Sequence, residues 1–509
     1  MERRTAGRTV LGRINSLTKR VYSWRMTQPT EVISHSPSTG AKIGRYPNSS
    51  DETINELVAR ATVAAEQWRL LGFRGRKIIL KSWAHYLAEH IEELSQLVAL
   101  ETGKPIGDAM LEVSIAIDHL SWAARKASKY LRNSHRTPGL LMAQMSTHVE
   151  YQPLGVIGVI GPWNYPVFTP MGSIAYALAA GNAVIFKPSE YTPGVGHWLG
   201  ESFNIVAPGL NIFFVATGGA QSGAALTRSL VNKIAFTGST ATGKKIAAVC
   251  AQNLTPVLME CGGTDPAIVD RDCNIDKAVE ALLWGAMANG GQTCVGIERI
   301  YVHQEIATEF IEKISFLASK LVAGRDYGAV TMPSQLSVID SHIKDAARLG
   351  AEFVVGNIDS VQPPFVLPTI MINIPEDSLA VSEETFGPTI TIRSVATMGE
   401  AIALANASKY GLSASVWSKR QGKLIAHQLQ CGMVSVNSVL AFTATPSMPF
   451  GGVKQSGYGR IHGPEGLREF TYTRAIVATR FNIPLNFATF ERKPWVDSFI
   501  KRLIKFLNR

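Results

Sequence analysis

The stretch STHVEYQPLGVIGVIGP, residues 146–162, changes its pattern partway along, and this change indicates the fold class. Polar and apolar residues alternate at first, and a run of apolar residues and glycine then extends to Ile160 and stops at Gly161-Pro162. A short apolar run bounded in this way is typical of a strand that is buried on both faces. Similar runs follow at 182–186, 211–215 and 233–237, with helical patterns between them. The sequence therefore predicts an α/β fold with a parallel sheet and crossover helices.

Further helical patterns precede this stretch, and a second α/β series follows it. Apolar residues recur at helical spacing after Asp51, which is expected to be an N-cap, and again over 79–97, up to the turn ETGKP at 101–105. Similar α/β units extend from about residue 265 to about 455, and TRAIVATRF at 473–481 resembles one more strand. A chain of 509 residues with this organisation is expected to form two or three domains.

Composition restricts the class of protein. Hydrophobic residues make up 46% of the chain and charged residues 18%, which is typical of a folded globular protein. The five cysteines are widely spread and form no CxxC pair, so the sequence predicts neither a disulfide framework nor a metal site. No apolar run reaches the roughly 18 residues of a membrane-spanning helix, and the N-terminus lacks the apolar centre of a secretory signal. These features favour the cytoplasm, a reducing compartment.

The formal net charge of +10 is concentrated at the two ends of the chain. Residues 1–25 carry seven basic residues against Glu2, and residues 490–509 carry six against Glu491 and Asp497, so these segments have charges of +6 and +4. The rest of the chain is therefore neutral. A neutral body argues against nucleic acid binding and leaves an anionic surface as a partner for the two ends.

Two strand-to-loop junctions contain residues suited to a dinucleotide. In KIAFTGSTATG, residues 233–243, an apolar strand leads into two glycines and a helix, whose N-terminus can bind a pyrophosphate. In GNAVIFKPSE, residues 181–190, Lys187 and Glu190 follow a strand end, where open α/β sheets bind ligands such as a ribose. The alternative for residues 233–243 is an ordinary glycine turn without a ligand, because the motif is not GxGxxG. The alternative for residues 181–190 is a solvated loop.

Three further residues have side chains suited to catalysis. Cys294 lies among small residues in NGGQTCVGIER, residues 289–299, and is either a small buried hydrophobe or an accessible nucleophile. Asn164, between two prolines in GPWNYP, is either a plain turn residue or a rigid hydrogen-bond donor to an oxyanion. Glu260 ends an apolar strand in LMECGG, where it is either a catalytic base or a residue at the mouth of a solvent channel.

Seven motifs occur together in the order and spacing of one family. They are PWN at 162–164, GN…KPSE at 181–190, FTGSTATG at 236–243, MECGG at 259–263, GQTC at 291–294, EETFGP at 383–388 and PFGGVKQSGYGR at 449–460. From about residue 30 to about residue 480, the chain resembles the aldehyde dehydrogenase superfamily, whose members depend on NAD(P). The resemblance implies a Rossmann-type cofactor domain, an α/β catalytic domain and a small oligomerisation arm of strands.

The resemblance also implies a role for each matching residue. Cys294 is then the nucleophile, Asn164 is an oxyanion donor that acts with the backbone N–H of Cys294, and Glu260 activates water. The cofactor is expected to be NAD in preference to NADP, because Glu190 near the adenosine ribose would repel a 2′-phosphate. The implied cofactor-binding residues are Lys187 and Glu190 at this ribose, Gly238 and Ser239 at the pyrophosphate, Glu384 at the nicotinamide ribose, Phe386 near the nicotinamide, and Trp163.

The family's architecture predicts how the chain is divided. Residues 30–131 and 152–259 would form the NAD-binding domain, and residues 260–465 the catalytic domain. Residues 132–151 and 466–485 would form the oligomerisation arm, which implies a homodimer or homotetramer. The two ends lie outside this scheme, as a basic N-terminal tail at 1–29 and a basic amphipathic helix at 490–509.

The chain departs from the family at positions that bear on proton transfer. Thr264 and Asp265 replace a lysine and a serine that commonly follow the base glutamate. Ser173 stands where many members have a lysine, and Ile461 where a glutamate is often found. Proton transfer would therefore depend more heavily on Glu260.

Other positions bear on the substrate. Gly172 stands where relatives acting on succinate semialdehyde often have an arginine, and an apolar entrance is predicted from Tyr165, Phe168, Met171 and Phe442. We therefore expect a hydrophobic aldehyde, either fatty, aromatic or isoprenoid. One alternative is a succinate-semialdehyde-type dehydrogenase, because the segment GRIHGPEGL at 459–467 resembles some of those enzymes. The alternative from another class is a non-catalytic scaffold protein with the same fold.

The end of the chain, from Pro494 to Arg509, lies beyond the resemblance and predicts an amphipathic helix. Trp495, Phe499 and Phe506 recur at helical spacing beside several basic residues. Such a helix either packs on protein, including a second subunit, or lies in a membrane interface. Together with the basic N-terminal segment, it predicts peripheral attachment to an anionic membrane.

Overall fold

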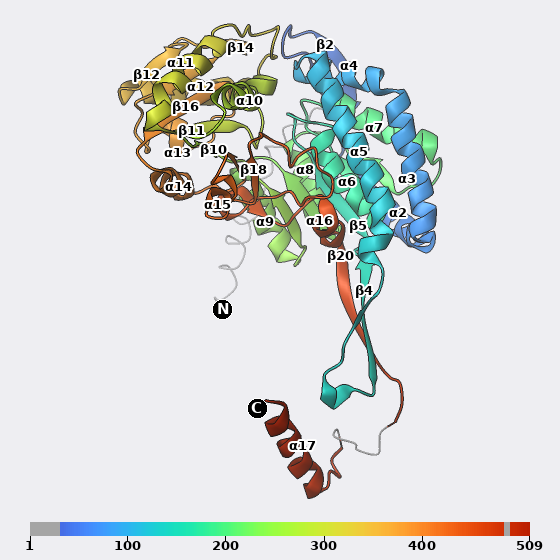
Figure 1. Ribbon diagram of the computed structural model, residues 1–509. Coiled ribbons are helices and arrows are strands. Elements are labelled where there is room, and N and C mark those ends of the chain that lie inside the picture. Colours follow the sequence, from blue (N-terminus) through green and yellow to red (C-terminus); the bar gives the residue numbers. More distant parts are fainter. Residues whose placement is uncertain (1–30, 483–488, 509) are drawn as a thin grey trace, which may run out of the picture.

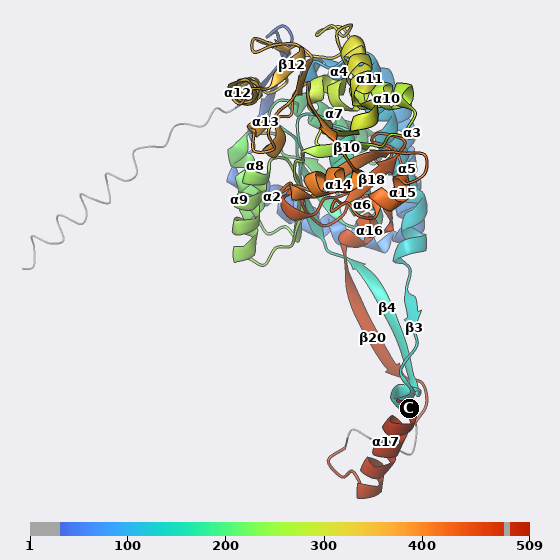
Figure 2. The ribbon, with the colours of Figure 1, turned by 60° about the vertical axis from the view of Figure 1, so that its left-hand side comes forward.

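The computed structural model describes residues 31–482 and 489–508, which form two α/β bodies side by side and one projecting arm (Figures 1 and 2). This architecture confirms the predicted α/β class. The basic tail expected at 1–29 lies outside the described residues. Among the helices in those residues, none has both the length and the apolar character needed to cross a bilayer.

The first sheet has six strands in the order β19-β9-β8-β5-β6-β7. Neighbouring strands are parallel except β19, which runs antiparallel to β9. Every residue of β5 and β6 is buried, which explains their unbroken apolar sequences. The bounds are β5 Val156–Ile160, β6 Ala183–Lys187, β7 Phe213–Val215, β8 Lys233–Thr237, β9 Val257–Glu260 and β19 Gly457–Tyr458.

Helices surround the first sheet (Figure 1). Ser50, and not the predicted Asp51, is the N-cap of the first of them, because its Oγ accepts a hydrogen bond from the backbone N–H of Thr53. These helices are α2 Asp51–Leu70, α3 Gly72–Glu89, α4 Ile91–Thr102, α5 Ile106–Leu131, α6 Phe168–Ala180, α7 Pro193–Val206, α8 Ala220–Arg228, α9 Thr240–Gln252 and α16 Gly463–Glu469.

The second sheet has seven strands in the order β12-β15-β16-β11-β10-β17-β18, with β12 antiparallel to its neighbour. Its strands are β10 Asp265–Val269, β11 Ile297–His303, β12 Glu352–Val355, β15 Thr369–Ile372, β16 Thr389–Val395, β17 Ser413–Trp417 and β18 Met433–Val436. Its helices are α10 Ile275–Met287, α11 Ala307–Ala318, α12 Pro333–Arg348, α13 Leu379–Ser382, α14 Met398–Ala407 and α15 Gly422–Ala426. Residues 261–264 connect β9 directly to β10, so the chain passes from the first sheet to the second just after Glu260.

The arm is a three-stranded antiparallel sheet in the order β20-β4-β3. It projects from the body, and α17 lies beyond its tip (Figures 1 and 2). The predicted strand at 473–481 is thus part of this arm. The bounds are β3 Ser134–Arg136, β4 Met145–Pro153, β20 Thr471–Thr479 and α17 Pro494–Leu507. The smaller elements are β1 Glu31–His35, β2 Lys42–Pro47, β13 Val361–Gln362, β14 Phe365–Val366 and the 3-10 turns Leu140–Met142, Ala288–Gly291, Gln304–Ile306 and Lys454–Ser456.

Candidate active site

Cys294 lies on the loop between α10 and β11, directly after a turn with unusual backbone geometry. Three consecutive residues, Asn289, Gly290 and Gly291, have left-handed conformations with φ angles of 55°, 65° and 72°. A Cβ at position 291 would collide with the backbone of Gly387, so only glycine fits where these two loops meet. The turn leaves Cys294 partly exposed at the wall of a cavity.

The Asn164 side chain is buried and connects the first sheet to the cysteine loop. Its Nδ2 donates a hydrogen bond to the backbone oxygen of Gln292, at 2.9 Å. Gln292 is itself fixed, because its Nε2 donates to the backbone oxygen of Asn289 at 2.7 Å and its Oε1 accepts from the backbone N–H of Thr331 at 2.8 Å. An amide nitrogen carries two hydrogens, and the bond to Gln292 uses one of them.

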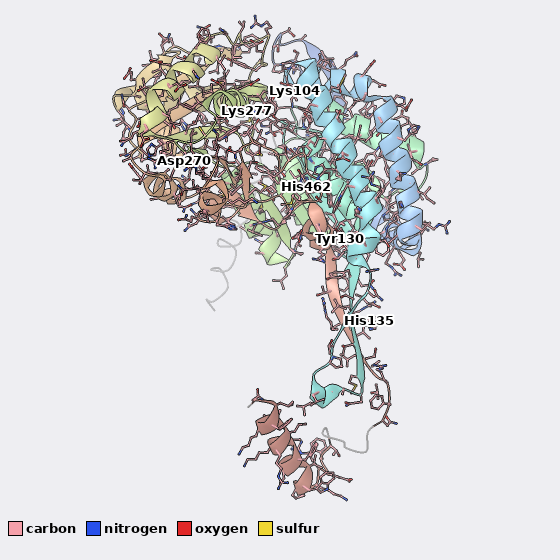
Figure 3. The ribbon with its side chains drawn as sticks, in the orientation of Figure 1. Lys104, Tyr130, His135, Asp270, Lys277 and His462 are labelled. Carbon is pink, nitrogen blue, oxygen red and sulfur yellow. The ribbon has the colours of Figure 1, made fainter. Side chains whose placement is uncertain are left out.

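Lys104 and Glu112 form a buried ion pair behind Asn164, which the sequence did not predict. The Nζ of Lys104 lies 2.6 Å from Glu112 Oε2 and donates to the backbone oxygen of Asn164 at 2.7 Å. Glu112 Oε1 accepts hydrogen bonds from the backbone N–H groups of Val167 and Phe168. This pair therefore fixes the backbone at and after Asn164. Lys104 is labelled near the boundary between the two bodies in Figure 3.

Glu260 ends β9 with its carboxyl group fully buried. Neither carboxyl oxygen has a hydrogen-bond partner among the described residues. Burial raises the pKa of Glu260 well above its ordinary value, although the positive charge of Arg460 opposes this effect. Buried carboxyl groups are almost always hydrogen-bonded, so one without a partner calls for an explanation. A water molecule brought into the cavity for activation would supply the missing partner.

The thiol of Cys294 is not ionised in the resting site. Burial raises its pKa well above the ordinary value, and the negative charge of Glu384 raises the pKa further. Because the thiolate is the nucleophilic form, attack on a substrate requires that a base remove the thiol proton.

A cavity of about 250 Å³ extends from Cys294 and Glu260. Its lining is mostly apolar and includes the predicted Tyr165 and Phe168, together with Leu111, Ile115, Trp284, Val439, Leu440 and Phe450. The other two predicted residues do not line it, because Met171 is fully buried in the core and Phe442 packs against Phe450, with ring centroids 6.1 Å apart.

The charged residues that line this cavity are acidic. They are Asp108, Glu112 and Glu260, and across residues 31–482 and 489–508 no lysine or arginine is part of the lining. The same residues contain no cluster of ligands suited to a metal ion. A substrate carboxylate would therefore have no cationic partner in the cavity wall.

His462, which the sequence did not indicate, lies in the wall of the cavity and is labelled in Figure 3. It is fully buried, and neither ring nitrogen has a hydrogen-bond partner among the described residues. Its ring centroid is 4.0 Å from that of His119, and burial beside this neighbour lowers the pKa of His462 well below its ordinary value. The imidazole is therefore neutral near pH 7 and provides one donor and one acceptor.

Two of the predicted cofactor regions lie at the carboxyl ends of β6 and β8. Lys187 ends β6, and its buried ammonium group lies 3.2 Å from the more exposed carboxylate of Glu190. Ser239 is the N-cap of α9, and a Cβ at the preceding Gly238 would lie 2.7 Å from the ring of Phe236. This edge of an open α/β sheet is where dinucleotides bind, and a helix N-terminus behind a bare glycine fits a pyrophosphate.

The other predicted cofactor residues gather around the loop after Glu260. Trp163 and Phe386 meet edge to face, with ring centroids 5.5 Å apart, and Glu384 Oε1 accepts a hydrogen bond from the backbone N–H of Gly263 at 3.2 Å. Glu298 holds the loop that carries Glu384 and Phe386 in place, because its buried carboxylate accepts a hydrogen bond from the backbone N–H of Phe386 at 2.9 Å. Burial raises the pKa of Glu298 to about 7. Glu298 has no role in the motifs read from the sequence, although it lies four residues after Cys294.

The chain is similar in sequence to proteins named as aldehyde-oxidising enzymes. It is 33% identical over 468 residues to 4,4'-diapolycopene aldehyde oxidase of Methylomonas sp, a match that covers 89% of this chain and 87% of the relative. It is 34% identical over 471 residues to a protein of Mycolicibacterium smegmatis provisionally named succinate-semialdehyde dehydrogenase (NADP+), with coverage of 90% and 89%.

Solved structures have the same fold. The crystal structure of an NAD-dependent aldehyde dehydrogenase from Sinorhizobium meliloti matches with a TM-score of 0.85 and 29% identity, covering 90% of this chain and 93% of that one. An Escherichia coli NADP-dependent enzyme matches with a TM-score of 0.85 and 31% identity, covering 88% and 95%. The sequence model of the aldehyde dehydrogenase family matches residues 24–476. The chain belongs to the aldehyde dehydrogenase family and is an oxidoreductase that acts on aldehydes.

Proposed function

We propose that the protein oxidises a hydrophobic aldehyde to the carboxylic acid, with NAD as the cofactor. The observation that carries this proposal is the wall of the 250 Å³ cavity at Cys294, which is mostly apolar and, in the described residues, contains no lysine or arginine. Apolar cavities with a few polar groups at the reacting end are typical of sites for apolar ligands.

The first step is the addition of the Cys294 sulfur to the aldehyde carbon, after the thiol proton has passed to a base from the solvent. The carbonyl oxygen then becomes negatively charged, and the free N–H of Asn164 and the backbone N–H of Cys294 stabilise it. One preorganised donor of this kind lowers the barrier by about 3–4 kcal/mol. Asn164 Nδ2 donates to the backbone oxygen of Gln292, and Lys104 Nζ donates to the backbone oxygen of Asn164. These two bonds hold the donor in place, so that it need not reorganise during the reaction.

NAD, when bound, accepts the hydride that leaves the substrate carbon and so leaves a thioester on Cys294. Trp163, Glu384 and Phe386 would hold its nicotinamide end, while Lys187, Glu190, Gly238 and Ser239 would hold its adenosine and pyrophosphate end. Glu260 then takes a proton from water, whose oxygen adds to the thioester carbon and releases the acid and the thiol. Its unpartnered carboxyl group at the end of β9 supports this role.

A succinate-semialdehyde-type activity is the second candidate, favoured by the likeness to the mycobacterial protein. Such a substrate carries a carboxylate, which would lie beside Asp108 and Glu112 without a cation to pair with. A buried charge without a partner is strongly disfavoured, so the apolar substrate agrees better with the cavity.

We also propose that the protein is a homodimer or homotetramer assembled through the arm. Residues of β4 are all half-buried, and Tyr472 and Val477 of β20 are exposed at 48% and 63%. A second copy covering these strands would remove that apolar surface from water.

We propose further that α17 attaches the protein to anionic membranes from the cytoplasmic side. Its exposed large side chains include Trp495, Phe499 and Phe506, and Lys501 and Lys505 lie on the same helix. A helix of this composition can bury its aromatic side chains at the lipid headgroups while its lysines contact acidic lipids. Such attachment would suit a poorly soluble aldehyde.

The substrate proposal is tested by following NADH absorbance with purified protein and a set of aldehydes. Hexanal, benzaldehyde and an isoprenoid aldehyde should each give a kcat/KM at least tenfold above that for succinate semialdehyde. A preference for succinate semialdehyde would overturn the hydrophobic assignment in favour of the second candidate. No turnover with any aldehyde would instead support the scaffold alternative.

A further inference from the structure

A second and larger cavity adjoins the one that contains Cys294. It has a volume of about 730 Å³ and lies between α10, α11 and the start of α5. In Figure 1, α10 lies between α11 and α5. Asp108, Trp284 and Ala288 are part of the lining of both cavities. The two cavities are therefore neighbours, separated by these residues, of which Trp284 is the largest.

The second cavity, here called the outer groove, is lined mainly by apolar side chains. They are Val279, Leu283, Met287, Phe316, Leu317 and Leu321. Phe316 is 60% exposed and Trp284 is 46% exposed, so two large aromatic side chains are left in contact with water. Neighbouring exposed apolar side chains in a concave surface are typical of a binding site.

The two lysines that line the outer groove each have a neighbour. Lys313 Nζ lies 2.6 Å from an oxygen of Asp276 and 2.8 Å from an oxygen of Glu309. Lys320 Nζ lies 3.7 Å from the centre of the Phe316 ring. Both lysines are therefore engaged by neighbouring side chains, which makes an apolar ligand a better match for the groove than an anionic one.

We propose that the outer groove binds the distal hydrocarbon of a long-chain aldehyde whose carbonyl group lies at Cys294. This inference rests on the proposed function and narrows its substrate class from hydrophobic aldehydes to long, extended ones. The inner cavity, at about 250 Å³, receives the reacting end, and the chain passes Trp284 to reach the outer groove. The position of the outer groove next to the cavity at Cys294 favours this occupant over a peptide or a second copy, whose binding would not require that position.

The first test measures binding without turnover. Hexanoate, decanoate and tetradecanoate are titrated calorimetrically into the full-length protein as analogues of the reaction product. Each methylene group that leaves water should strengthen binding by about fourfold, and this gain should continue beyond the length that fills the inner cavity. Affinity that stops rising after hexanoate would overturn the proposal.

The second test uses a matched pair of exposed apolar residues. Phe316→Asp places a charge on the floor of the outer groove, and Leu424→Asp does the same at a position on α15 that is 63% exposed. The ratio of kcat/KM for tetradecanal to that for hexanal should fall at least tenfold in Phe316→Asp and stay at the wild-type value in Leu424→Asp. Equal ratios in all three proteins would show that the groove is not used.

These results separate the two proposals. If the protein oxidises hexanal but shows no chain-length effect, the proposed function stands and the proposal for the outer groove is wrong. A protein that oxidises no aldehyde loses the proposed function, whereas the carboxylate titrations still decide whether long chains bind.

Discussion

The imidazole of His462 occupies the space beside Gly172, so that a Cβ added to this glycine would lie 2.5 Å from Nε2. The side chain of Ile461 closes the same space, with its Cδ1 at 2.9 Å from that Cβ. An arginine at position 172, as in many relatives that act on succinate semialdehyde, is therefore excluded by the neighbours of this glycine. The apolar character of the cavity thus depends on packing as well as on the residue at position 172.

Gly172→Ala should destabilise the protein, because the buried His462 ring has little room to move. Overpacking of this kind costs about 1–3 kcal/mol, which outweighs the gain of about 1 kcal/mol for alanine in a helix. Thermal unfolding provides the measurement. The control is Gly223→Ala in α8, where a Cβ meets nothing within 4 Å and the melting temperature should stay the same or rise. Equal changes in melting temperature for the two variants would show that the His462 ring moves aside without cost.

Glu260→Gln should produce a single burst of NADH and then stall, because hydride transfer precedes the attack of water on the thioester. Stopped-flow absorbance at fixed NAD measures the burst. Cys294→Ser is the control, since an alcohol is a far poorer nucleophile than a thiolate, and it should give neither burst nor turnover while still folding and binding NAD. A Glu260→Gln protein without a burst would assign Glu260 to an earlier step.

The rate of oxidation should rise as the pH increases above neutrality. Burial raises the pKa of both Cys294 and Glu260, and the reaction uses the deprotonated form of each. Both active forms therefore become more populated at higher pH. A pH profile of kcat/KM follows the steps up to hydride transfer, which depend on Cys294, and a profile of kcat also follows the later step at Glu260. In Glu260→Gln the burst rate should still rise with pH, because the thiol remains. A rate that falls between pH 7 and pH 9 would contradict this assignment.

Glu190→Gln should shift cofactor use toward NADP. Removing the carboxylate removes the repulsion of a 2′-phosphate and leaves Lys187 without its 3.2 Å partner, so the NAD to NADP ratio of kcat/KM should fall about tenfold. Steady-state kinetics with both cofactors gives this ratio. Glu201→Gln on the neighbouring α7 is the control and should leave the ratio unaltered. An unchanged ratio in Glu190→Gln would mean that this residue does not face the ribose.

Removal of residues 494–509 should release the protein from vesicles that contain phosphatidylserine. The exposed aromatic side chains of α17 supply the apolar contact, and each well-placed basic residue adds about 1 kcal/mol of attraction. Co-sedimentation at low and high salt measures the binding, with neutral phosphatidylcholine vesicles as the control. Full-length protein that remains in the supernatant at low salt would support a helix packed on protein instead.

The sequence predicted the parts of the fold that depend on local patterns. The runs at 155–160, 182–186 and 233–237 became β5, β6 and β8, because strands buried on both faces require unbroken apolar sequence. The start of the C-terminal helix at Pro494 was also predicted from a local feature, because the missing N–H of proline is tolerated in the first turn of a helix. Strand β19 has only two residues, too few for any periodicity.

The candidate site was predictable only where chemistry and motif coincide. Cys294, Glu260 and Asn164 stand in recognisable sequences. Glu298 and Lys104 instead bond to residues far away in the chain, and His462 packs against the distant His119. Lys104, for example, reaches the backbone of Asn164 from the end of a turn that the sequence marks only as a helix stop. Contacts between residues so widely separated leave no periodic signal, and they emerge only once the two bodies are packed together.

Strand β19 affects the order in which the surroundings of Glu260 are completed during synthesis. Gly457 pairs with Glu260, so the edge of strand β9 is covered by residues that are translated long after β9 itself. A nascent chain that has emerged as far as β11 already contains the cysteine and the glutamate, yet β9 is still an open edge. Pairings between distant segments form late, because a large loop must close first. The edge of β9 beside Glu260 is therefore completed only after residues 457–458 have been made.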